Sequence, residues 1–246
     1  MKNTLYLSVL SVLMLAQACA QDGSSTISYE LKLYDFVNLP EGISNLHYGV
    51  YPDTTIYPGT YSNLSEVKNE TVEELLASRL SERSLTWHQF NYDFEEERDL
   101  TVNYQELFDR WIAGGRKYEL LSLLTYEYND DLYAEVLLRF NDSSNVANFI
   151  IPKPLIKKEG RWFFTNSEPS SMLTFFVGLE DTQPESVYNI LNQQPANKGE
   201  EAILEKSLDE NDDLDFEKLS QALRNIRDEA ETNPAIEAIL LPNEMF

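Results

Sequence analysis

The stretch from Lys117 to Phe140 decides the fold, and it reads KYELLSLLTYEYNDDLYAEVLLRF. Apolar side chains recur through its first half as in a half-buried strand, which puts on one face Tyr118, Leu120, Leu124, Tyr126 and Tyr128. The residues Asn129, Asp130 and Asp131 favour a turn. Apolar residues then alternate again, on one face of a second strand, at Leu132, Ala134, Val136, Leu138 and Phe140. The pattern predicts an antiparallel hairpin.

A second hairpin is expected directly after the first. Its strands run from Val146 to Ile156 and from Arg161 to Thr165, and residues 158–160 (Lys-Glu-Gly) form the turn. Residues 171–179 are apolar enough to add a fifth strand. Because some of these strands are apolar on both faces, helices must cover the sheet. We therefore expect an α+β fold in which an antiparallel β-meander packs on helices.

Upstream of the meander, the pattern changes several times. Residues 27–33 alternate apolar with polar side chains and predict another strand. Residues 39–61 contain prolines and predict a loop or short edge strands, because proline lacks the N–H of a sheet ladder. Two interpretations stay open for the tyrosines of this segment. They either form an exposed surface for a glycan or protein partner, or anchor the loop to the core: Tyr48, Tyr51, Tyr57 and Tyr61.

Two helices and one more strand are expected between this segment and the meander. Thr71 and Glu74 fit a capping box at the start of a helix over 69–80. Residues 84–92 predict a strand. A second helix over 101–112 carries an apolar stripe, and Gly114 and Gly115 end it.

The C-terminal residues 183–246 predict an acidic helical extension of the domain formed by residues 27–182. From Pro195 onward the chain has 14 acidic and 5 basic residues. Helical spacing of apolar residues appears over 200–208, 216–230 and 235–240. A segment of this size has a thin core of its own, so we expect an appendage rather than an independent domain.

Composition and charge exclude several classes of function. The chain has 246 residues, with 42% hydrophobic and 25% charged, as in ordinary globular proteins. With 19 Lys plus Arg against 42 Asp plus Glu, the net charge is -23. Nucleic-acid binding needs cationic side chains that displace counterions from phosphates, so no nucleic-acid partner is expected.

The N-terminal residues are typical of an export signal. Lys2 gives a positive start, residues 5–15 are nearly all apolar, and residues 16–18 (Ala-Gln-Ala) place small side chains where a signal peptidase reads them. We expect residues 1–18 to be a signal peptide and residues 19–26 to be a polar tether.

The only cysteine, Cys19, follows directly after Ala18. This segment resembles the lipobox of bacterial lipoproteins, although Ala16 and Gln17 depart from the residues that family favours. The resemblance implies cleavage before Cys19, lipidation of Cys19 and attachment to the membrane through the N-terminal lipid. Ala20 at the next position then suggests the outer membrane, with the protein facing the periplasm. A conventional cut after Ala18 or Ala20 would give a secreted or periplasmic soluble protein instead.

Helices followed by a meander and a charged turn ending in Gly160-Arg161-Trp162-Phe163 are similar to the nuclear transport factor 2-like arrangement, over residues 101–165. The resemblance implies a curved sheet wrapped round helices to form a cone. That fold hosts enzymes, binders and structural modules, so it transfers no activity. A ligand pocket of this type would lie between the meander and the helix over 101–112, with Trp111, Tyr126 and Phe140 as candidate lining residues.

The sequence contains few motifs that indicate catalysis, cofactor binding or metal binding. It has no phosphate-binding Gly-rich loop, no paired-cysteine or His-Glu-x-x-His metal motif and no Gly-x-Ser-x-Gly elbow, and we predict no cofactor. Oxygen ligands at every second position suggest a calcium loop: Asp209, Asn211, Asp213 and Asp215. However, Leu214 and Ser220 replace the Gly and Glu of such a loop. The alternative is that these acids cap the helix that begins near Phe216.

The function favoured by the sequence is therefore that of a lipid-anchored, non-catalytic protein of the bacterial cell envelope, acting by binding or assembly. Its partner would be an envelope protein or a glycan. Two alternatives are a small-ligand-binding module of cone type and a carboxylate-dependent hydrolase.

Overall fold

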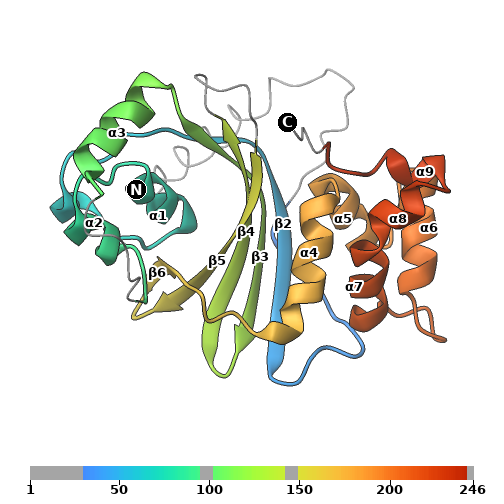
Figure 1. Cartoon of the computed structure of the whole chain (residues 1–246). Helices are drawn as coiled ribbons and strands as arrows, with labels where there is room; N and C mark the ends of the chain where they lie inside the picture. The colour runs from blue at the N-terminus through green and yellow to red at the C-terminus, as the bar shows by residue number, and fades with distance from the viewer. Residues whose placement is uncertain (1–29, 95–101, 142–148, 243–246) are drawn as a thin grey trace, which may run out of the picture.

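The computed structural model describes residues 30–94, 102–141 and 149–242. Within these residues, six strands form one antiparallel sheet in chain order from β1 to β6. Helices cover both faces of the sheet, as Figure 1 shows. The expected α+β fold with an antiparallel meander is confirmed.

The central strands form the two predicted hairpins. The strands are β1 (Lys32–Leu33), β2 (Ile43–Ile56), β3 (Lys117–Tyr128), β4 (Asp131–Asn141), β5 (Phe149–Lys158) and β6 (Arg161–Phe164). Between β3 and β4, Asn129 and Asp130 both have positive φ (51° and 70°). Asn and Asp tolerate this left-handed backbone, which a two-residue hairpin turn needs to match the twist of its strands.

A β-bulge in β3 divides the face that the sequence pattern treats as continuous. Leu120 pairs with Leu138, while Ser122 pairs with the adjacent Leu137, so Leu121 is an extra residue in β3. One extra residue moves all the following side chains to the opposite face. Tyr118 and Leu120 therefore pack on one face, whereas Leu124, Tyr126 and Tyr128 pack on the other. The prediction that they share a face was wrong.

The segment predicted as a loop or short edge strands over residues 39–61 instead contains β2, which is the longest of the described strands at 14 residues. Pro52 is accommodated because the pairing of β2 with β3 is irregular between Val50 and Thr54. Pro52, which has no backbone N–H to donate, thus lies where the hydrogen bonding between β2 and β3 is interrupted.

Three helices form a lobe on one face of the sheet: α1 (Val72–Arg79), α2 (Leu85–Phe90) and α3 (Tyr104–Ala113). We call this the first face. Thr71 and Glu74 form the predicted capping box of α1. The strand predicted over residues 84–92 is instead α2, because Ser84 accepts a hydrogen bond from the backbone N–H of Trp87 and so caps a helix.

The remaining helices cover the second face: α4 (Leu173–Asp181), α5 (Pro184–Leu191), α6 (Lys198–Ser207), α7 (Phe216–Arg224), α8 (Ile226–Ala230) and α9 (Pro234–Glu237). The fifth strand predicted over 171–179 is α4, since a short run that is apolar on every side fits either element. One buried cluster joins β2 and β3 to all six helices, α4–α9. The packing therefore continues across residues 182 and 183, where the sequence predicted a boundary between the domain and its extension.

One edge of the sheet, and the segment that follows β1 at the other edge, are bonded to helical parts of the chain. The backbone N–H groups of Trp162 and Phe164 in β6 donate to the carbonyls of Asn69 and Asn91 in the α1–α3 lobe. Beyond β1, Val37 exchanges backbone hydrogen bonds with Leu214 and Phe216 at the start of α7. Short 3-10 turns lie at Leu64–Glu66 and Ser170–Met172.

The predicted signal peptide, Cys19 and the tether over 19–26 lie outside the described residues. In the part of the chain that is described, each helix is too short or too polar to cross a bilayer.

Candidate functional site

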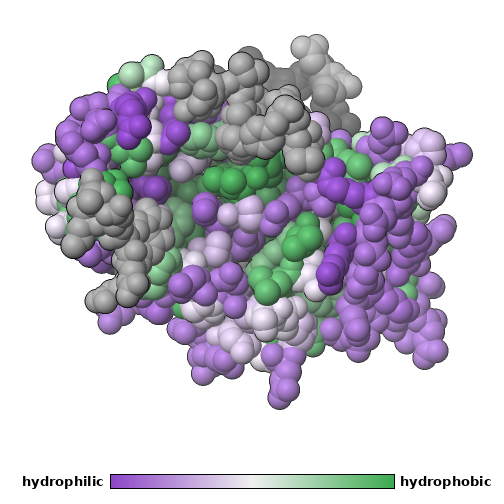
Figure 2. Space-filling model, viewed as in Figure 1, coloured by the Kyte–Doolittle hydropathy of each residue, from purple (hydrophilic) through white to green (hydrophobic). Residues whose placement is uncertain are grey.

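A cavity of about 370 Å³ lies on the first face, between the α1–α3 lobe and the strands. Arg79 from α1 and Trp111 from α3 line one side of it, and Tyr118, Phe140 and Ile151 from the sheet line the other. Figure 2 shows a hollow with apolar side chains between the helical lobe and the sheet. The size is within the range of small-molecule sites, roughly 300–1,000 Å³.

The charged side chains that line this cavity are all cationic. They are Arg79, Arg116 and Lys153, and none of the described lining residues is acidic. The lining thus differs from the chain as a whole, which has a net charge of -23, although Arg79 is paired with Glu82 just outside the lining. A low-dielectric cavity walled by one sign of charge concentrates ions of the opposite sign.

Trp111 lies between the two arginines. The Cζ atoms of Arg79 and Arg116 are each 5.0 Å from the centre of its ring, and the Cζ of Arg116 is also 4.3 Å from the Phe140 ring. Attraction between a guanidinium and an aromatic face holds the arginine side chains in place. Trp111 itself is buried, and its indole Nε1 has no hydrogen-bond partner among the described residues.

A buried carboxylate fixes the guanidinium of Arg79 from the side of the lobe. Arg79 Nη1 donates to Glu82 Oε2 over 2.6 Å, and the same oxygen is 2.8 Å from His88 Nδ1. Glu82 is 1% exposed. Burial by itself lowers the pKa of Arg79, but the Glu82 carboxylate together with Tyr92 and Tyr118 more than offsets this, so the net pKa is raised. Arg79 is therefore a permanent cation at the cavity wall.

A chain of buried hydrogen bonds supports Glu82. Its Oε1 accepts from Asn91 Nδ2 over 2.8 Å. Asn91 Oδ1 in turn accepts from Ser78 and Asn69, and Ser78 Oγ accepts from the indole of Trp87. Buried networks of this kind rigidify the elements that they join, here α1, α2 and the segment before them.

The structure brings two of the three predicted ligand-binding residues together. Trp111 and Phe140 line the cavity. Tyr126 does not, because the bulge at Leu121 turns it to the second face, where it stacks on Tyr133 with ring centres 5.7 Å apart. The placement of Tyr126 in this pocket was therefore wrong.

Two of the four residues of the possible calcium loop, Asp209 and Asp215, accept hydrogen bonds from nearby backbone N–H groups. Asp209 Oδ1 accepts from the N–H groups of Asn211 and Asp213. Asp215 caps α7 by accepting from the N–H of Lys218, and it also accepts from Asn38. Within the described ranges, no three His, Cys, Asp or Glu side chains are grouped to hold a metal ion. The arrangement is that of a turn and a helix cap.

The tyrosines of residues 48–61 mostly pack inward. Tyr48 is buried and donates to the carbonyl of Pro184, and Tyr51 and Tyr61 pack against the core of the first face. Only Tyr57, which is 60% exposed, has the exposure that a glycan-binding side chain would need.

Glu135 is a buried acid of the second face, 7% exposed and outside the cavity lining. Burial, followed by the nearby Glu168 and Glu180, raises its pKa well above the ordinary value, and Lys153 opposes the shift. The pKa of Glu180 is also raised, by burial and by Asp181. Neither Glu135 nor Glu180 lines the cavity on the first face or the second cavity, beside α5.

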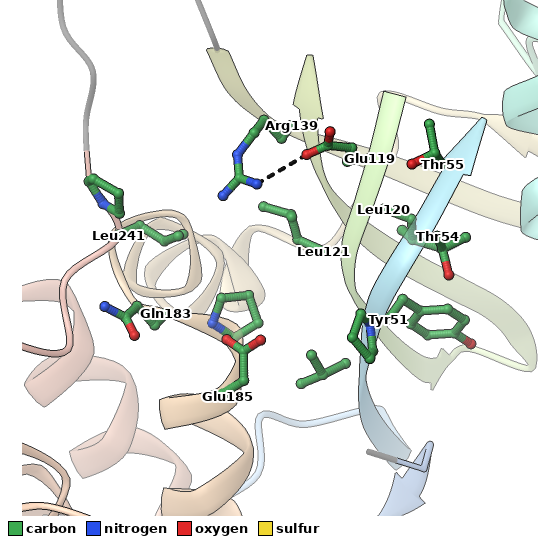
Figure 3. Close-up of a pocket in the computed structure, with 14 residues that line it drawn as sticks. Tyr51, Thr54, Thr55, Glu119, Leu120, Leu121, Arg139, Gln183, Glu185 and Leu241 are labelled. Atoms are coloured by element: carbon green, nitrogen blue, oxygen red, sulfur yellow. Dashed lines mark hydrogen bonds and ion pairs between the residues drawn. The ribbon is translucent and has the colours of Figure 1, made fainter. Parts of the chain in front are cut away.

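A second cavity, of about 470 Å³, lies between β2–β4 and the start of α5 (Figure 3). Its charges compensate one another: Arg139 Nη1 is 3.1 Å from Glu119 Oε2, and Lys117 also pairs with Glu119. Burial raises the pKa of Glu119, but these two cations outweigh it and the net pKa is lowered. In the cavity on the first face, the described lining holds no acid, and Arg79 is paired with Glu82, which lies outside the lining.

Sequence reasoning missed Arg79 and Glu82. A signal for Arg79 exists, because it continues the apolar stripe of α1 after Val72, Leu75 and Leu76. A cation on a buried stripe needs a buried partner. Glu82 has no such signal, since it lies three residues beyond the end of that helix.

Comparisons with protein-family models, curated proteins and solved structures gave no match. The chemistry of the site therefore follows from the residues of this chain alone.

Proposed function

We propose that this protein is a lipid-anchored protein of the bacterial cell envelope that binds a small molecule in the cavity of the first face. The single observation that carries the binding function is the cavity itself, walled by Trp111, Phe140 and three cations. The leader and Cys19 support the anchoring part. The protein acts without covalent chemistry, by holding its ligand near the membrane.

A neutral fluorescent probe, N-phenyl-1-naphthylamine, tests binding independently of charge. We expect its emission to rise with the purified protein, because an apolar cavity shields the probe from water. Ile151→Trp fills the cavity and should abolish the rise. Val177→Trp adds the same ring at an exposed position on α4 and should leave the signal unchanged. Equal binding to all three proteins, each checked for folding by thermal melting, would exclude this cavity as the binding site.

Anchoring is tested in cells by Cys19→Ser, which removes the only thiol. Metabolic labelling with palmitate should disappear, and the protein should leave the membrane fraction. Unchanged labelling or fractionation would contradict lipidation at Cys19.

A further inference from the structure

We infer that the exposed side of α4, together with the acids beside it, is a docking surface for a partner protein whose docking segment carries lysine or arginine next to apolar side chains. This surface lies on the second face of the sheet, away from the cavity of the first face, so the inference does not depend on the small-molecule function. We call it the α4 surface. Its residues are Leu173, Val177, Glu180, Glu168 and Glu135.

The apolar part of the α4 surface consists of two exposed side chains. Leu173 and Val177 are each 46% exposed and lie four residues apart, on one side of the helix. Figure 2 shows hydrophobic side chains at the surface in the region that α4 occupies in Figure 1. Phe175 and Phe176, on the other side of the helix, are buried in the core of the second face. Single exposed apolar residues are ordinary, so the groups beside this pair decide what it binds.

Three acids lie beside this apolar pair, at the boundary between α4 and the sheet. Glu180 follows Val177 by three residues, so it is the next side chain along the same side of the helix. Glu180 and Glu168 both act electrostatically on Glu135 of β4. Glu168 belongs to the segment after β6. Carboxyl groups from three separate parts of the chain are therefore close together next to the exposed leucine and valine.

The described part of the chain supplies these acids with little positive charge. Glu135 is 7% exposed, and its carboxyl group makes no hydrogen bond or ion pair with the described residues. Oε2 of Glu168 is buried and also lacks a hydrogen-bond partner among them. Lys153 acts on Glu135 from the sheet, but burial and the two neighbouring acids outweigh it, so the pKa of Glu135 is raised. A cation from a partner would supply the missing charge.

Charge favours a basic partner over a second copy of this chain. In a symmetric dimer the same acids would face one another, and like charges across an interface cost free energy. A segment that combines lysine or arginine with apolar residues fits both parts of the α4 surface, because its apolar side chains cover the exposed pair while its cations bind the acids. The partner is therefore a protein with a basic amphipathic segment.

Docking of a cation should also release a proton. A nearby positive charge favours the ionised carboxylate, so it lowers the raised pKa of Glu135. The affinity should then increase with pH until the free protein has lost this proton. The titratable and charged groups around this carboxyl are Glu168, Glu180, Lys153, Tyr126 and Tyr133. The two tyrosines and the lysine keep their charge state below about pH 9, so the carboxyl groups set the pH dependence.

The test measures by fluorescence anisotropy how tightly the full-length purified protein binds two model peptides. Both peptides are amphipathic helices of leucine, one with lysine and the other with glutamate. We expect the lysine peptide to bind and the glutamate peptide not to bind. Val177→Ser and Glu180→Gln should each weaken binding of the lysine peptide about threefold or more.

Each of these variants has a matched control. Val102→Ser changes a valine that is 41% exposed ahead of α3, and Glu205→Gln changes an exposed acid on α6, so both should leave the affinity unchanged. The affinity of the wild-type protein should rise from about pH 5 to about pH 8, and Glu135→Gln should reduce this rise. Thermal melting checks that every variant is folded.

Several results would overturn the inference. Absence of binding by the lysine peptide, or equal binding of both peptides, contradicts a surface that is complementary to basic segments. Unchanged affinity in both Val177→Ser and Glu180→Gln places the peptide elsewhere on this acidic chain. A dimer that Val177→Ser dissociates in analytical ultracentrifugation shows that a second copy covers the α4 surface. A pH dependence that Glu135→Gln leaves unchanged overturns the role of this acid in docking. The cavity is tested separately, by N-phenyl-1-naphthylamine.

Discussion

Two buried acids on opposite faces of the sheet, Glu82 and Glu135, have opposite surroundings. On the first face, Glu82 is paired with Arg79 and His88 and bonded to Asn91, and a cavity remains beside this network. On the second face, six helices fill the interior with apolar side chains, and Glu135 has neighbouring acids in place of a partner. Both environments meet at β4, where Val136 and Glu135 point to opposite sides. The comparison shows that β4 separates a face on which the buried Glu82 is ion-paired from one on which the buried Glu135 has other acids nearby.

The bulge at Leu121 decides which residues each face receives, so its removal should have the largest effect. Deleting Leu121 places Leu124 and Tyr126 on the wrong face or breaks the pairing of β3 with its neighbours. We expect loss of the cooperative thermal transition, measured by circular dichroism. Leu121→Ala keeps the extra residue and should cost only about 1 kcal/mol. A deletion variant with the wild-type spectrum and transition would show that the bulge is dispensable.

The sequence predicts the meander well because its strands alternate over many residues and their turns carry Asn, Asp and Gly. Leu132, Ala134, Val136, Leu138 and Phe140 share the first face as expected. The pattern fails at Leu121, because a bulge inside an apolar run leaves no mark in residue types. It also fails at Ser84, where a helix cap outweighs β-propensity. At the site, Trp111 and Phe140 were predictable from the sequence. Glu82 was not, because its position depends on the path that the chain takes after α1.

Removing the buried carboxylate of the first face tests whether its ion pair is structural. Glu82→Ala leaves Arg79, whose side chain is only 15% exposed, without its carboxylate partner, and breaking a buried pair typically costs about 3–5 kcal/mol. Urea unfolding measures the loss. The control is Glu70→Ala, because this acid is 63% exposed and 3.9 Å from Lys68, and exposed pairs contribute at most about 1 kcal/mol. Similar losses for the two variants would contradict the distinction between the faces.

Neutralising Glu135, the buried acid of the second face, should raise the stability of the protein, whereas removing Glu82 should lower it. The pKa of Glu135 is raised on folding, so the folded state holds its proton to higher pH than the unfolded chain. The stability from this proton is complete below the ordinary value of 4.5 and is lost as the pH rises toward the folded value.

Glu135→Gln should therefore stabilise the protein at pH 7, by roughly 1 kcal/mol for each unit of the shift. The gain should vanish near pH 4, where the wild-type carboxyl is protonated. Urea unfolding at both pH values measures it, and Glu205→Gln on the exposed side of α6 should show no such dependence. A destabilised Glu135→Gln at neutral pH would indicate that the carboxylate has a partner.

Calcium should produce the smallest change. Asp209 and Asp215 already bond to backbone N–H groups of their turn and of α7, so they do not converge on an ion. We expect the same melting temperature with and without millimolar calcium, and no heat in a calorimetric titration. A rise in melting temperature that Asp209→Ala removes would restore the metal site.

The bonded edges of the sheet bear on how copies of the protein behave at high local density. An open strand edge exposes a row of unpaired backbone groups to which another chain can add a strand. Here the lobe occupies N–H groups of β6, β1 is only two residues long, and Pro52 interrupts β2. Another copy brought close to this sheet would therefore meet edges that are short, interrupted or already bonded, so addition of a strand there is disfavoured.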